Sequence, residues 1–87
     1  MYKIHNKGIQ ERILKIIHNN WPVHVREVAR HLDLDPYDIS NVSKIRYHFK
    51  SLEKQEKIRT KKIGRALVAW PTEMEKLRLI HELLREV

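Results

Sequence analysis

The sequence contains no cysteine and, among its 87 residues, only two glycines and three prolines. The absence of cysteine excludes disulfides, thiolate zinc sites, iron–sulfur clusters and a cysteine nucleophile. No window contains the roughly 18 uncharged apolar residues that a membrane-spanning helix needs, and the N-terminus lacks the apolar segment of a signal peptide. We therefore expect a single soluble, cytoplasmic domain over residues 1–87, with no membrane partner.

Acidic residues are scarce in one part of the chain. Between residues 41 and 65 there are nine lysines and arginines and two glutamates, so this segment accounts for the whole formal net charge of +7. The rest of the sequence is balanced. An excess of one sign that is confined to one segment indicates a polyanionic partner such as nucleic acid. A solvated basic surface without a partner is the alternative.

The spacing of the apolar residues predicts four helices, over about residues 7–20, 25–32, 36–55 and 72–87. Asn6 is a candidate N-cap for the first helix, and the pair Asp35-Pro36 is typical of the start of the third. The first turn after Pro36 does not share the apolar stripe of the residues that follow. We therefore expect that turn to be kinked or separate, with Ser40 or Asn41 capping the main helix again.

Two short segments have the alternating pattern of strands. Residues 58–62 and 66–70 flank the turn Ile63-Gly64-Arg65, which predicts a hairpin with a basic tip. Residues 23–25 are long enough only for one strand-like bridge. Pro71 is expected to end the second strand, and Thr72 and Glu75 form the pattern of a capping box for the last helix.

This order of elements, with the stretches "VHVREVARHLDL", "VSKIRYHFKSLEKQEKI" and "GRALVAW", resembles the small winged helix-turn-helix transcription regulators of the ArsR and MarR type. The resemblance covers residues 23–70. It implies a mostly α fold with a β-hairpin wing. Those regulators commonly have Gly then Leu before the first wing strand, where this chain has Glu56 and Lys57. A less sharp exit from the preceding helix is therefore expected.

The resemblance implies a sequence-specific double-stranded DNA-binding transcriptional regulator, with residues 41–55 in the major groove and the wing, residues 58–70, on phosphate or in the minor groove. A buried stripe on the recognition helix leaves the opposite face outward, with Tyr47 at its centre. The candidates for base reading are Asn41, Ser43, Lys44, Arg46 and Tyr47. The candidates for backbone contact are Lys50, Lys54, Arg59, Lys61, Lys62 and Arg65, the last of which can instead enter the minor groove.

Two of these candidates have other roles open to them. Tyr47 can pack on a partner chain or on the wing, because a tyrosine side chain is amphipathic and suits protein interfaces. Arg46 can pair with Glu53 and lie flat on the helix.

Catalysis and metal binding are not expected. His24, Glu27 and His31 share one helix face at a spacing that can supply metal ligands. His24 is better placed to cap the second helix, however, and His31 to lie on its exposed side. No catalytic triad order, glycine-rich phosphate loop or paired carboxylates are present. The expectation is a protein that is not an enzyme and holds no metal or cofactor.

The last helix, residues 72–87, carries an apolar arc of about 220°, wider than one core contact needs. We expect it to form a homodimer, with packing over the first helix as the alternative. The dimerisation candidates are Leu77, Leu79, Ile80, Leu83, Leu84 and Val87. An alternative function is a winged-helix module of a larger complex that binds protein, or nucleic acid without sequence preference.

Overall fold

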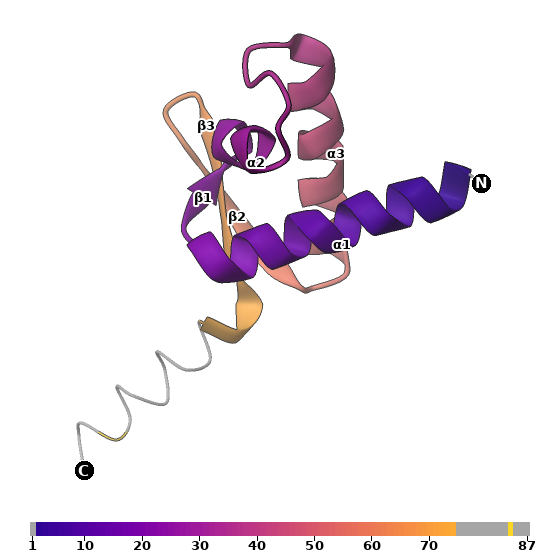
Figure 1. Cartoon of the computed structure of the whole chain (residues 1–87). Coiled ribbons are helices and arrows are strands. Elements are labelled where there is room, and N and C mark those ends of the chain that lie inside the picture. Colours follow the sequence, from indigo (N-terminus) through magenta and orange to yellow (C-terminus); the bar gives the residue numbers. More distant parts are fainter. Residues whose placement is uncertain (1, 75–83, 85–87) are drawn as a thin grey trace.

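The computed structural model describes residues 2–74 and 84 (Figure 1). Its elements are α1 (Tyr2–Asn20), β1 (Val23–His24), α2 (Val25–His31), α3 (Ile39–Lys54), β2 (Ile58–Ile63) and β3 (Ala66–Pro71). The three strands form an antiparallel sheet in the order β1-β3-β2. Three helices with a small sheet that ends in a hairpin are the arrangement of a winged helix, so the predicted fold class is confirmed.

One face of α3 forms the centre of the hydrophobic core. Ile45, Phe49 and Leu52 are all buried, as the apolar stripe predicted. Each of the other elements contributes apolar side chains to the same cluster, which also contains Ile13, Ile17, Val23, Val25, Val28, Ala29, Ile58 and Ala69. The core is therefore shared by the whole described chain, as expected for a domain of this size.

The first helix is longer than predicted. It begins at Tyr2 and passes through Asn6, so Asn6 lies inside α1 and is not its N-cap. Asparagine in a helix interior costs at most about 0.7 kcal/mol relative to alanine. That cost is too small to end a helix whose neighbouring residues all tolerate helical backbone.

The third helix begins after Pro36, not at it. Its N-cap is Asp38, whose Oδ1 accepts the N–H of Ser40 at 2.8 Å, so neither Ser40 nor Asn41 caps it. Asp35 accepts the N–H of Tyr37 at 2.9 Å and forms a turn of its own. Two aspartates each accept the N–H two residues ahead, and the second of them sets the start of α3.

α2 and α3 end in the same way, and both lack the usual glycine. Beyond α3, Glu56 has φ 61° while the N–H of Lys57 donates to the carbonyl of Leu52 at 3.0 Å. Beyond α2, Asp33 has φ 58° and the N–H of Leu34 donates to the carbonyl of Ala29 at 2.9 Å. Both are Schellman motifs. The exit from α3 is thus as sharp as one with glycine, and the expectation of a less sharp exit is wrong.

The hairpin pairs β2 with β3 from Ile58 opposite Pro71 to Ile63 opposite Ala66. Its turn consists of Gly64 and Arg65, and Gly64 takes φ 61°, which glycine adopts without a steric penalty. β3 continues through Pro71, one residue beyond the predicted strand.

The base of the hairpin is tied to the end of α3. The hydroxyl of Thr72 donates to the carbonyl of Glu56 at 2.9 Å, and the N–H of Thr72 donates to the carbonyl of Lys57 at 3.2 Å. Glu75, the other half of the predicted capping box, lies outside the described residues.

Two isoleucines on α3 provide a matched test of the core. Ile45 is 2% exposed and Ile39 is 81% exposed. We expect Ile45→Ala to lower the free energy of unfolding by about 2–5 kcal/mol, and Ile39→Ala to change it by no more than about 0.5 kcal/mol. Urea denaturation measures both values. Equal losses would show that α3 does not bury the assigned face.

The positive φ of Glu56 gives a second prediction. Glu56→Gly removes the steric strain of a side chain in the left-handed region and should raise the free energy of unfolding by about 1 kcal/mol. Lys54→Gly, two residues earlier and inside α3, should lower it by a similar amount, about 0.5–1 kcal/mol. Thermal and urea denaturation of both variants measure these opposite changes in the free energy of unfolding. If residue 56 were helical, both substitutions would lower it.

Candidate nucleic-acid interface

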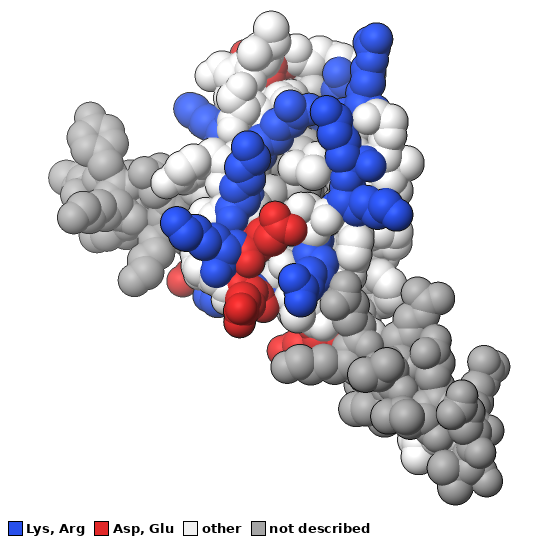
Figure 2. Space-filling view, turned by 180° about the vertical axis from the view of Figure 1, so that it is seen from behind, with Lys and Arg blue, Asp and Glu red and all other residues white. Residues whose placement is uncertain are grey.

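The N-terminal end of α3 and the tip of the β2–β3 hairpin extend toward the same end of the molecule, away from α1 (Figure 1). Figure 2 shows lysine and arginine side chains gathered over one face of the molecule, with a smaller acidic group beside them. The fold thus places the start of the basic helix and the tip of the basic hairpin at the same end of the molecule.

The outward face of α3 carries exposed side chains of three chemical kinds: a hydroxyl at Ser43, an ammonium at Lys44 and a phenol at Tyr47. Tyr47 is 68% exposed. Its ring meets the ring of His48 edge-on, with centroids 5.5 Å apart and planes at 74°. Tyr47 is therefore supported on one side by a buried neighbour and open on the other, and it makes no ring contact with the hairpin within the described residues.

Asn41 is placed differently from the other base-reading candidates. It is only partly exposed, and its Nδ2 donates to the carbonyl of Asp35 at 3.2 Å. Its side chain therefore fastens the turn between α2 and α3. Asn41 therefore lies at the edge of the outward face, with its amide N–H already engaged by the backbone.

The basic candidates all lie on the surface. The exposed residues of this kind are Arg46, Lys50 and Lys54 on α3, Arg59, Lys61 and Lys62 on β2, and Arg65 in the turn. The pairing of Arg46 with Glu53 is not observed. Glu53 instead accepts the N–H of Thr60 at 3.1 Å and its hydroxyl at 2.8 Å, which joins α3 to β2. In the described part of the chain, Arg46 makes no ion pair and is available to a ligand.

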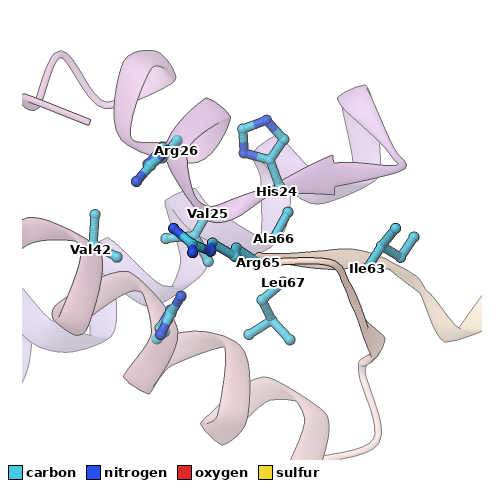
Figure 3. A pocket seen from close by; sticks show the side chains of 9 residues that line it. His24, Val25, Arg26, Val42, Ile63, Arg65, Ala66 and Leu67 are labelled. Atoms are coloured by element: carbon cyan, nitrogen blue, oxygen red, sulfur yellow. The ribbon is translucent and has the colours of Figure 1, made fainter. Parts of the chain in front are cut away.

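A pocket of about 400 Å³ lies between the start of α2, α3 and the hairpin tip (Figure 3). Arg26 of α2 lines it together with Arg46 and Arg65. Sequence reasoning missed Arg26, because Glu27 follows it and the local charge count is zero. The available signal was the position of Arg26 shortly after β1, because β1 pairs with β3 and so lies beside the hairpin.

His48 connects the recognition face to α1. It is buried, and Gln10 Nε2 of α1 donates to its Nδ1 at 3.1 Å. Gln10 Oε1 in turn accepts from Gln55 Nε2 at 3.1 Å. Burial lowers the pKa of His48 below its ordinary value of 6.5. The imidazole is therefore neutral at physiological pH, which its acceptor role at Nδ1 requires.

Two histidines flank α2, one at each end. His24 caps α2 by accepting the N–H of Glu27 at Nδ1, and its Nε2 lies 3.0 Å from Glu27 Oε1. His31 is exposed. Within residues 2–74 and 84, no group of three or more histidines and carboxylates is placed to hold a metal ion.

No helix in the described part of the chain combines the length and apolar character needed to cross a bilayer. Of the dimerisation candidates, Leu77, Leu79, Ile80, Leu83 and Val87 lie outside the described residues. Leu84 is described and is 69% exposed.

Comparison with known families gives a match over most of the chain. The family described as "Ribonuclease R winged-helix domain" matches residues 11–82, which include α2, α3 and the hairpin. Among curated proteins and solved structures, no match to the chain was found. The match supports the winged-helix class that the sequence resembles, but not the ArsR and MarR regulators in particular.

The environment of His48 predicts a pH dependence of stability. Because its pKa is lowered in the folded chain, the unfolded chain binds the proton more readily. The free energy of unfolding should therefore be highest above pH 6.5 and fall as the pH drops through that value toward the lower pKa of the folded state. Urea denaturation between pH 7.5 and 5 measures the fall.

His48→Gln should flatten this dependence, because the titrating group is gone, whereas His18→Gln, on the exposed side of α1, should leave it unchanged. A wild-type profile in the His48→Gln variant would contradict the assignment.

Proposed function

Since the chain belongs to the family of ribonuclease R winged-helix domains, we propose that it binds double-stranded DNA, with α3 in the major groove and the β2–β3 hairpin against the adjacent backbone. In this role it acts as a sequence-specific transcriptional regulator. The observation that carries the proposal is the outward face of α3. This face has exposed hydrogen-bonding and aromatic side chains with basic side chains around them, and it begins at the same end of the molecule as the tip of the basic hairpin.

The use of a helix as the contact surface favours double-stranded DNA over double-stranded RNA as the ligand. The major groove of B-form DNA, about 12 Å wide, admits a helix with its side chains. The major groove of A-form RNA is too deep and narrow for side chains to read. A helix that offers its side as the main contact surface therefore favours DNA over double-stranded RNA.

The side chains divide into two roles by position and chemistry. Ser43, Lys44 and Tyr47 lie in the N-terminal half of α3, which enters the groove first, and can reach base edges. Lys50 and Lys54 follow one and two turns later and face phosphate. Lys61 and Lys62 on β2 are exposed in the hairpin and supply attraction that does not depend on sequence.

Dimerisation belongs to the same proposal. Two copies joined through the C-terminal helix predicted at residues 72–87 would present two α3 helices to half-sites about 34–36 Å apart. The wide apolar arc of that sequence segment supports a dimer. A solution mass twice that of the chain is the expected result.

A second candidate function follows from the family itself. The family takes its name from a ribonuclease, which favours a winged helix that holds nucleic acid without sequence preference as one part of a larger assembly. In that case the cations of α3 and the hairpin contribute alike, and Tyr47 has no special role.

Substitutions on the two surfaces separate the candidates. If α3 reads sequence, Tyr47→Ala and Lys44→Ala should each reduce the preference for the best selected duplex over a scrambled one by about 1–3 kcal/mol. Lys61→Ala and Lys62→Ala should weaken both duplexes alike and reduce the salt slope by about one unit each.

The measurement is selection from random DNA with the wild-type chain, followed by titration of each variant at two salt concentrations. A failure to enrich any sequence, with uniform losses in all four variants, would favour the non-specific module.

A further inference from the structure

Three arginines from three separate elements line the pocket between α2, α3 and the hairpin tip. Arg26 lies on α2, Arg46 on α3 and Arg65 in the turn between β2 and β3. Figure 3 shows the guanidinium groups of Arg26, from α2, and Arg65, from the hairpin turn, extending toward the same side of the pocket, near Val25. We call Arg26, Arg46 and Arg65 the arginine pocket.

The arginine pocket has an uncompensated positive charge. None of its lining residues is acidic, and within residues 2–74 and 84 none of the three arginines forms an ion pair. The nearest acidic residue in sequence, Glu27, contacts His24 at 3.0 Å. Like charges that share one concave site repel each other, so a bound anion relieves repulsion as well as gaining attraction.

The arginine pocket is partly preorganised. The Arg26 guanidinium lies over the ring of Tyr37, 5.2 Å from its centroid, a cation–π contact that limits where the side chain can go. The apolar part of the lining consists of Val25, Val42, Ile63, Ala66 and Leu67. An apolar wall lowers the local dielectric constant and strengthens the attraction for an anion.

We propose that the arginine pocket binds one phosphate group. The planar fork of a guanidinium donates two parallel hydrogen bonds to phosphate oxygens, and three such forks from different directions suit a tetrahedral anion better than a planar one. The inference deepens the proposed function and rests on it for the source of the phosphate. In the proposed docking, the DNA backbone at the edge of the major groove passes between α3 and the hairpin tip, where the pocket opens.

Two sources share this chemistry. An internal phosphodiester carries one negative charge, whereas a phosphate at a strand end carries about 1.5 to 2 at neutral pH. The three arginines favour the phosphate at a strand end, because it carries more negative charge. The position of the pocket between α3 and the hairpin suits an internal phosphodiester.

The first experiment uses inorganic phosphate as the probe and the whole chain as the sample. In NMR spectra of the nitrogen-15-labelled protein, phosphate should shift the side-chain Nε–Hε signals of Arg26, Arg46 and Arg65 and leave that of Arg30 in place. Arg26→Gln should weaken phosphate binding by about tenfold, the loss expected for one charge-assisted pair of hydrogen bonds. Arg30→Gln is the matched control, because it removes the same charge from the same helix outside the pocket; its loss should be less than about twofold.

The second experiment identifies the source of the phosphate. Duplexes with 5′-phosphate and 5′-hydroxyl ends are titrated with the wild-type chain and with both variants. A loss in Arg26→Gln that is equal for the two duplexes assigns an internal phosphodiester, and a loss confined to the 5′-phosphate duplex assigns a strand end.

The outcomes separate the inference from the function. Unshifted arginine signals, or equal weakening in Arg26→Gln and Arg30→Gln, overturn the arginine pocket even if the chain binds DNA. Shifted signals, with phosphate binding that Arg26→Gln weakens and Arg30→Gln does not, in a chain that binds no duplex, support the pocket and overturn the proposed function. Circular dichroism melting of both variants, each altered at an exposed position, confirms that they remain folded.

Discussion

The burial of one face of α3 is the contact on which the other features depend. Phe49 and its neighbours on that face receive side chains from both other helices and from the sheet, so the hairpin and α2 are placed by reference to this helix. The opposite face is left outward as a consequence. Because each residue of a helix has a fixed angular position, the same packing that hides Ile45 exposes Tyr47.

Where structure follows from local periodicity, the sequence was sufficient to predict it. The stripe on α3, the hairpin around Gly64 and the bridge at β1 all have signals within a few residues, and all are confirmed. The start of α3 was harder, because Asp35 and Asp38 are chemically equivalent caps and only the path of the chain decides between them. The left-handed conformation of Glu56 has no local signal, since the hydrogen bonds around it override the preference of the residue.

The residues of the candidate site also divide into those that a local sequence pattern predicts and those that only the fold brings together. The exposure of Lys44, Tyr47 and the hairpin cations follows from periodicity and charge, and sequence reasoning found them. Arg26 joins Arg46 and Arg65 only because the fold brings three elements together, so a count of charge along the chain could not reveal it. The sequence pattern could not predict the finer function either, because one winged-helix fold serves proteins with different tasks, and the family match is to the winged-helix domain of ribonuclease R and not to transcription regulators.

Gln10 holds His48 of α3 with its amide nitrogen and Gln55, the C-cap of α3 seven positions later, with its amide oxygen. Those positions are about two helical turns, or roughly 10 Å, apart along the axis. The amide therefore joins α1 to the α3 region at two points along the helix axis. A proton on Nδ1 of His48 would turn that acceptor into a donor, so the hydrogen bond from Gln10 Nε2 could not persist. Protonation of His48 at low pH would therefore weaken the packing of α1 against α3 inside the fold, and not a contact on the surface.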